Sequence, residues 1–220
     1  MTETKTLEFE AALSELPIFP LPQVVLFPHA MLPLHVFEPR YRALLKDCLV
    51  THKAMAIGLV VSSGEVDEQG HPRLASIVGA GIIVEHQSLA DGRSNVMLHG
   101  RARVRLEELP FVPPYRRARA TLLQDKPTTA SPEDRAALVA SATAFANGVR
   151  RRDPNFSFRL PQNVETGALA DICAYHLVVD VRVRQSVLEE LDPAERARIV
   201  TAELAGQHGL LLRDSGQVSN

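Results

Sequence analysis

The sequence contains little cysteine, little lysine and no long apolar run. Its two cysteines, Cys48 and Cys173, lie far apart among apolar neighbours, which favours buried free thiols in a reducing compartment over a disulfide framework. No stretch approaches the roughly 18 apolar residues that a transmembrane helix needs. Residues 1–16 have neither the basic nor the apolar region of a signal peptide. We therefore expect a cytoplasmic protein that does not bind membranes.

Motifs of nucleotide-dependent and hydrolytic enzymes are also missing. The sequence has no G-x-x-x-x-G-K-[ST] loop to hold phosphates and no G-x-S-x-G turn to present a nucleophilic serine. His35 and Glu38 have a spacing that would suit metal ligands on a helix, but residues 34–37 favour a strand, which would point the two side chains to opposite faces. Glu38 is better explained as a carboxylate at a helix start, near Arg40 or Arg42. We predict no catalytic residue, no metal site and no cofactor.

The most distinctive segment that is present runs from Leu16 to Leu49, LPIFPLPQVVLFPHAMLPLHVFEPRYRALLKDCL. Five prolines stand among its apolar residues: Pro17, Pro20, Pro22, Pro28 and Pro33. Because proline cannot donate a hydrogen bond to a sheet, the run predicts short strands separated by stiff turns. Pro39 suits the first turn of a helix, and the apolar residues that follow it to Leu49 keep helical spacing.

Up to about residue 125 the pattern is typical of strands. The predicted strands span residues 54–61, 75–89, 95–106 and 115–123. Gly79 and Gly81 inside the second of them indicate a bulge or a bend, and Asp91-Gly92 indicates a tight hairpin. Sharply bent antiparallel strands of this number predict a small closed or nearly closed barrel.

The second half of the chain is predicted to be helical. A polar connector, residues 125–130, leads to Ser131-Pro132, which is typical of a helix start, and this helix should run to about Arg151. Further helices are expected at residues 164–178, from Asp180 through Leu191, and from Asp192-Pro193 to Gly206 or Gly209. The fold class is therefore α+β, with a β-barrel subdomain over residues 14–125 and a helical bundle over residues 131–213.

Several of these segments together resemble one protein family. The pattern LP-x-FPL…LFP…LPL-x-x-FE-x-RY in residues 16–41 closely resembles the opening of the Lon substrate-binding domain, the N-terminal module of Lon-type ATP-dependent proteases. Residues 77–81, 89–93 and 98–104 resemble this family's glycine-bearing strand, its hairpin and its L-x-G-x-x-R-x segment. His29 departs from the family, which usually has glycine after LFP. The resemblance spans about Leu16 to Leu204.

The resemblance implies a PUA-like pseudo-barrel followed by a helical bundle, and a module that binds polypeptide. The ATPase motifs and the Ser-Lys protease pair of full-length Lon have no counterpart in these 220 residues. The partner would be an unfolded polypeptide or a specific protein, and the module would act as an adaptor, a client binder or a regulator. The apolar and proline-rich stretches 21–28 and 111–115 should leave side chains outside the core to make a binding surface. The candidate polypeptide-binding residues are Leu21, Pro22, Val25, Phe27, Phe111 and Tyr115.

Two alternatives remain open at this point. Arg101, Arg103 and Arg105 should form a stripe on one face of a predicted strand, where they would bind RNA phosphates. Against this, Glu107 and Glu108 follow at once, no aromatic residues interleave, and the net charge of -2 gives no overall attraction to nucleic acid. The second alternative is a small-molecule enzyme with its site between barrel and bundle, which needs convergent polar groups in a deep cleft.

Overall fold

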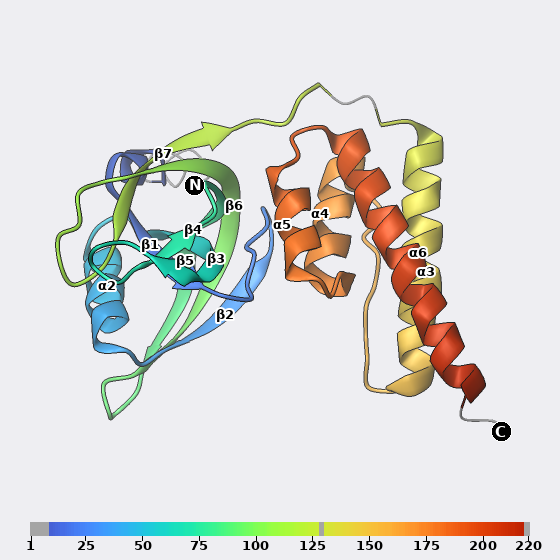
Figure 1. Ribbon diagram of the computed structural model, residues 1–220, viewed down its shortest axis with the longest axis horizontal. Helices are drawn as coiled ribbons and strands as arrows, with labels where there is room; N and C mark the ends of the chain where they lie inside the picture. The colour runs from blue at the N-terminus through green and yellow to red at the C-terminus, as the bar shows by residue number, and fades with distance from the viewer. Residues whose placement is uncertain (1–8, 128–129, 218–220) are drawn as a thin grey trace. The chain divides into compact units, whose positions relative to one another are not determined.

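The computed structural model describes residues 9–127 and 130–217, which form two compact units. The described residues up to Leu123 make a β-rich unit, and those from Gln124 onward make a helical unit (Figure 1). The α+β class expected from the sequence is confirmed. The family's barrel-then-helices order is also seen, with strands β1 to β7 preceding helices α3 to α6.

The β unit combines a strongly curved seven-stranded sheet with helix α2. Its elements are η1 (Leu13–Glu15), β1 (Leu16–Leu21), β2 (Met31–Val36), α2 (Pro39–Val50), β3 (Ala54–Val66), β4 (Pro72–Leu74), β5 (Ile77–Ser88), β6 (Ser94–Glu108) and β7 (Arg117–Leu123). The sheet order is β1-β7-β6-β5-β3-β4, and a parallel pairing of β1 with β3 closes the barrel. β2 adds to one half of β6. The predicted strands are present, although β3 continues past the predicted end at Val61 to Val66.

Local sequence signals explain how α2 begins and how it packs. Glu38 is the N-cap residue and Pro39 occupies the first helical turn, where its missing N–H costs nothing. The helix buries Tyr41, Leu44, Leu45 and Cys48. This spacing places one apolar stripe against the sheet.

The segment between β1 and β2 packs tightly against two glycines of the barrel. Val25, Leu26 and Phe27 are all buried, with exposed fractions of 1%, 0% and 1%. A Cβ atom at Gly79 on β5 would lie 1.8 Å from the backbone oxygen of Leu26. One at Gly100 on β6 would lie 2.0 Å from the backbone oxygen of Phe27. The two glycines therefore allow a backbone-to-backbone approach that any side chain would prevent.

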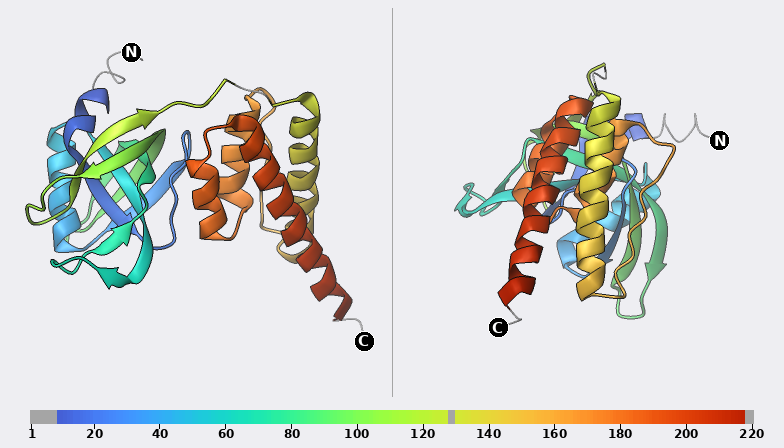
Figure 2. Two further views of the ribbon diagram at one scale, coloured as in Figure 1. Left: turned by 45° about the horizontal axis from the view of Figure 1, so that its top comes forward. Right: turned by 90° about the vertical axis from the view of Figure 1, so that its right-hand side faces the viewer.

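The helical unit consists of α3 (Pro132–Arg152), α4 (Thr166–Leu177), α5 (Val181–Glu189) and α6 (Pro193–Gln217). The long helix α6 packs against α3 and α4 (Figure 2). The predicted end of this helix at Gly206 or Gly209 is wrong, since the helix continues to Gln217. Glycine is tolerated inside a helix at a cost of about 1 kcal/mol, and packing against α3 outweighs that cost here.

A buried arginine organises one end of the helical unit. Arg196 on α6 is fully buried, and its Nη1 and Nη2 atoms donate to the two carboxylate oxygens of Asp125 at 2.7 and 2.5 Å. Its Nε atom lies 3.3 Å from Oδ1 of Asp171, a carboxylate that is itself buried. Nη1 also donates to the carbonyl of Glu190. The planar guanidinium thus joins the connector, α4 and the segment before α6.

Ser131 caps α3 as the sequence predicts. Its hydroxyl accepts from the N–H of Asp134 while the Asp134 carboxylate accepts from the N–H of Ser131, which makes a complete capping box. Replacing Ser131 by alanine should lower the free energy of unfolding by about 1 kcal/mol, because a helix N–H loses its acceptor. Urea denaturation followed by circular dichroism measures this loss. The control is Ala136→Ser, a change at an exposed position on the same helix. If Ser131→Ala were as stable as the wild type, the cap would not contribute to stability.

Both cysteines are buried and free. Burial raises the pKa of each thiol, to about 12 for Cys48 and about 12 for Cys173. The two therefore serve as small apolar core residues. None of the helices in residues 9–127 and 130–217 is both long enough and apolar enough to span a membrane.

Candidate functional site

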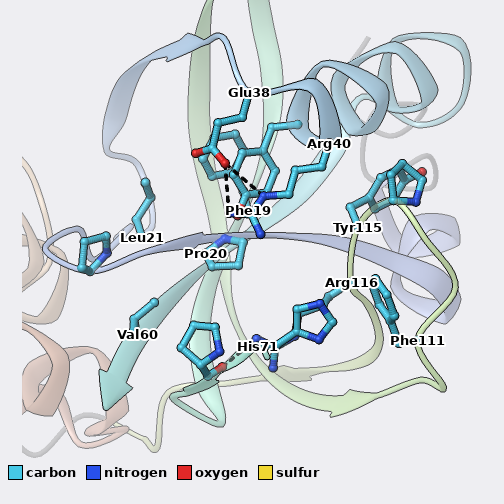
Figure 3. A pocket seen from close by; sticks show the side chains of 14 residues that line it. Phe19, Pro20, Leu21, Glu38, Arg40, Val60, His71, Phe111, Tyr115 and Arg116 are labelled. Atoms are coloured by element: carbon cyan, nitrogen blue, oxygen red, sulfur yellow. Dashed lines mark hydrogen bonds and ion pairs between the residues drawn. The ribbon is translucent and has the colours of Figure 1, made fainter. Parts of the chain in front are cut away.

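A pocket of about 280 Å³ opens on the β unit where four segments of the chain meet (Figure 3). They are the end of β1, the start of α2, the β3–β4 hairpin, and the segment that precedes β7. The lining residues are Phe19, Pro20, Leu21, Pro22, Glu38, Arg40, Tyr41, Val60, His71, Pro72, Phe111, Pro114, Tyr115 and Arg116. Residues almost a hundred positions apart thus share one concave surface.

Aromatic rings and prolines make most of the pocket wall. The rings of Phe19 and Tyr41 stack with their centroids 4.3 Å apart. The ring of His71 meets that of Phe111 edge to face, also at 4.3 Å. Aromatic pairs of this kind are stiff and present a large apolar surface. The wall is therefore preformed for an apolar guest.

The polar groups around the pocket are largely bonded to the protein itself. Nε and Nη2 of Arg116 donate to the carboxylate of Glu108, and its Nη1 donates to the carbonyl of Pro72 at 2.7 Å. The hydroxyl of Tyr115 donates to Oδ2 of Asp47 at 2.6 Å. Burial raises the pKa of Tyr115, and this hydrogen bond to Asp47 raises it further. These groups fix the wall and leave few donors for a ligand.

One exposed ion pair lies at the pocket. Nη2 of Arg40 is 3.0 Å from Oε2 of Glu38, and the Arg40 guanidinium lies 4.5 Å from the centre of the Tyr41 ring. The expectation that Glu38 stands at the helix start beside Arg40 agrees with this geometry. Since both side chains are about half-exposed, the pair adds a polar border to an otherwise apolar site.

Four of the six candidate polypeptide-binding residues line this pocket: Leu21, Pro22, Phe111 and Tyr115. Val25 and Phe27 do not, because both side chains are buried in the barrel. The prediction that these two contribute to an exposed surface is wrong. It failed because residues 25–27 pack against the glycines of β5 and β6 instead of alternating as a strand. A binding role for the other four stays a prediction.

The three candidate arginines do not share an exposed face. Arg103 is 4% exposed, Arg101 is partly buried, and Arg105 is exposed. The register between β5 and β6 shifts between the pair Ala80–Ala102 and the pair Gly81–Gly100, so Arg101 falls at an irregularity where alternation breaks. The expectation of a continuous arginine stripe is therefore wrong.

No metal site emerges from the described side chains. His35 is exposed on β2, with its Nδ1 atom 2.7 Å from Oδ1 of Asn95, while Glu38 pairs with Arg40. Within residues 9–127 and 130–217, no three His, Cys, Asp or Glu side chains gather as ligands for an ion.

Sequence reasoning missed His71, Pro72 and Arg116 as parts of the pocket. Each belongs to a different turn or loop from Leu21, and no local pattern connects them. The available signal was a local abundance of proline and aromatic residues. The same signal identified residues 111–115 as a candidate binding segment.

Comparison with known proteins gives a consistent result. The model of the family described as ATP-dependent protease La (LON) substrate-binding domain matches residues 15–206. Lon protease 2 of Sorangium cellulosum (strain So ce56) is 30% identical over 209 residues, covering 93% of this chain and 26% of that protein. Lon protease 2 of Myxococcus xanthus is 29% identical over 210 residues, covering 93% of this chain and 25% of that protein. The chain thus spans about a quarter of the length of these curated relatives.

Solved structures share the fold. The crystal structure of a Lon N-terminal domain protein from Xanthomonas campestris has a TM-score of 0.62 at 24% identity, covering 86% of this chain and 97% of that one. The N-terminal domain of a Mycobacterium avium complex Lon protease has a TM-score of 0.62 at 15% identity, covering 87% and 98%. At these identities the likeness concerns the fold.

Proposed function

This chain belongs to the family of the ATP-dependent protease La (LON) substrate-binding domain, and from that membership we propose that it binds polypeptides without catalysing a reaction itself. The observation that carries the proposal is the pocket on the β unit. Its walls are aromatic and proline side chains, and its polar groups are mostly bonded within the protein. Such a surface suits the apolar segments that an unfolded polypeptide exposes and that a folded protein keeps buried.

The proposed role is that of an adaptor, a client binder or a regulator. The family match covers a substrate-binding domain, and these 220 residues carry no phosphate-binding loop. The partner would be an unfolded polypeptide or one dedicated protein. The proposal includes a cytoplasmic location, which suits the two buried free thiols Cys48 and Cys173.

Replacing Phe111 by serine should weaken polypeptide binding about tenfold, since a ring of the pocket wall is lost. The measurement is fluorescence anisotropy of labelled, permanently unfolded casein titrated with the protein at low and high salt. Binding through apolar contacts should change little with salt, unlike binding through charges. Phe111 is partly buried, so circular dichroism must first show that the variant is folded.

The matched control is Val112→Ser. Val112 is the next residue along the chain, is 58% exposed and does not line the pocket, so its replacement should leave the affinity unchanged. If Phe111→Ser and Val112→Ser weakened casein binding equally, the binding site would lie outside this pocket. Labelled single-stranded RNA is titrated in parallel, and tight RNA binding that collapses with salt would contradict the proposal. So would ATP or casein hydrolysis far above that of a heat-inactivated preparation.

A further inference from the structure

One edge of β1 borders the pocket. On its other side β1 pairs in parallel with β3, Ile18–Leu21 standing opposite residues 56–59. On the pocket side its pairing with β7 comprises Leu16 opposite Ala118 and Pro17 opposite Arg117. The next N–H, that of Ile18, donates to the carbonyl of Arg116 at 3.0 Å. Within the described part of the chain, no strand pairs with β1 on this side beyond that point.

An open strand edge beside an apolar pocket ordinarily invites an extended peptide to add as another strand. The added strand gains main-chain hydrogen bonds, and the pocket then selects its side chains. This mode requires the edge to offer both N–H donors and carbonyl acceptors to the guest.

The edge of β1 lacks the donor that this mode needs. Because N–H groups of alternate strand residues point to the same edge, the nitrogen of Pro20 points to the same side as the N–H of Ile18. Proline has no N–H, and the N–H of Ile18 is already bonded to Arg116. Figure 3 shows Pro20 on the strand that crosses the pocket, between Phe19 and Leu21. A guest strand laid here would find carbonyl groups without the matching donors.

The rest of the wall offers little to a peptide backbone either. Pro22, Pro72 and Pro114 also line the pocket and also lack an N–H. All three guanidinium nitrogens of Arg116 are engaged within the protein. Among the apolar side chains that line the pocket, Leu21 and Phe111 are partly exposed and Pro22 is exposed.

We propose that this pocket holds its polypeptide partner by apolar side chains alone, without adding a strand to β1. The ligand class is then an unstructured segment with clustered aromatic and aliphatic side chains, whatever the state of its backbone amides. This inference rests on the proposed function, because it specifies how the same pocket binds polypeptide.

The experiment titrates four labelled peptides of equal length with the wild-type protein. The first carries a central Leu-Phe-Ala-Phe-Leu cluster in Gly-Ser flanks, and the second is the same peptide with alternate amides of the cluster N-methylated. In the third, both phenylalanines are serine. A second N-methylated peptide, with the other set of amides blocked, covers either register. Each is titrated by anisotropy, and the first two are repeated with Phe111→Ser and Val112→Ser.

Side-chain binding predicts that both N-methylated peptides bind within about threefold of the unmodified one, since no main-chain ladder is lost. The serine peptide should bind at least about tenfold more weakly, and so should the first two peptides when they are titrated with Phe111→Ser. If either N-methylated peptide lost tenfold or more while the unmodified peptide bound at the pocket, the inference would fall and the proposed function would stand. Absence of binding by all peptides, together with absence of casein binding, would overturn both.

Discussion

Replacing Gly79 by alanine is expected to destabilise the β unit by at least about 3 kcal/mol. The added methyl carbon would lie 1.8 Å from the backbone oxygen of Leu26 and 2.7 Å from its carbonyl carbon. Both are backbone atoms, so no side-chain rotation can relieve the overlap. The buried segment 25–27 would have to leave the barrel, and its apolar side chains would return to water.

Urea denaturation followed by tyrosine fluorescence measures this loss, because two of the three tyrosines, Tyr41 and Tyr115, lie in the β unit. The control is Gly64→Ala on β3, where an added Cβ meets nothing within 4 Å. That variant should stay within about 0.5 kcal/mol of wild type. Wild-type stability of Gly79→Ala would mean that the segment before β2 does not lie against β5 in solution.

Replacing Arg196 by methionine is expected to lower the free energy of unfolding of the helical unit by about 3–5 kcal/mol. Methionine fills part of the space, but Asp171 keeps a buried negative charge that has lost its contact with the guanidinium. Asp125 also loses the two hydrogen bonds that attach it to α6. Removing one member of a buried ion pair costs more than the pair itself contributes, because the remaining charge is left desolvated.

Far-UV circular dichroism during urea denaturation follows this unit, since helices dominate the signal. Adding Asp171→Asn to the Arg196→Met variant removes the buried negative charge and should recover part of the stability. Arg198→Met, a change on α6 like Arg196→Met, breaks a partly exposed ion pair with Asp134 of α3 and should have little effect. A small loss for Arg196→Met, similar to that for Arg198→Met, would contradict a buried charge cluster.

Helix starts were predictable from the sequence because their causes are local. Ser131 and Asp180 accept hydrogen bonds from N–H groups two or three residues further on, so each signal lies within one short segment. The end of α6 was not predictable in this way. Gly206 and Gly209 resemble stop signals, but the packing of α6 on α3 carries the helix past both.

The barrel and part of its pocket also followed from the sequence, whereas burial of particular side chains did not. Leu21 and Phe111 were chosen because stiff apolar stretches must leave some residues outside the core. Val25 and Phe27 were chosen by the same argument and lie inside it. The difference depends on Gly79 and Gly100, which let the backbone of residues 26 and 27 approach closely. These glycines lie more than fifty residues further along the sequence. No pattern within residues 21–28 contains that information.

The closure of the barrel also sets an order of events during synthesis. The residues that pair with β1 lie about 40 positions later on β3 and about 100 positions later on β7, so its contacts are among the least local in the chain. The ring of strands cannot be completed until β7 has left the ribosome. The apolar strand β1 therefore emerges before its partners and acquires the last of them only after about 100 further residues have been made.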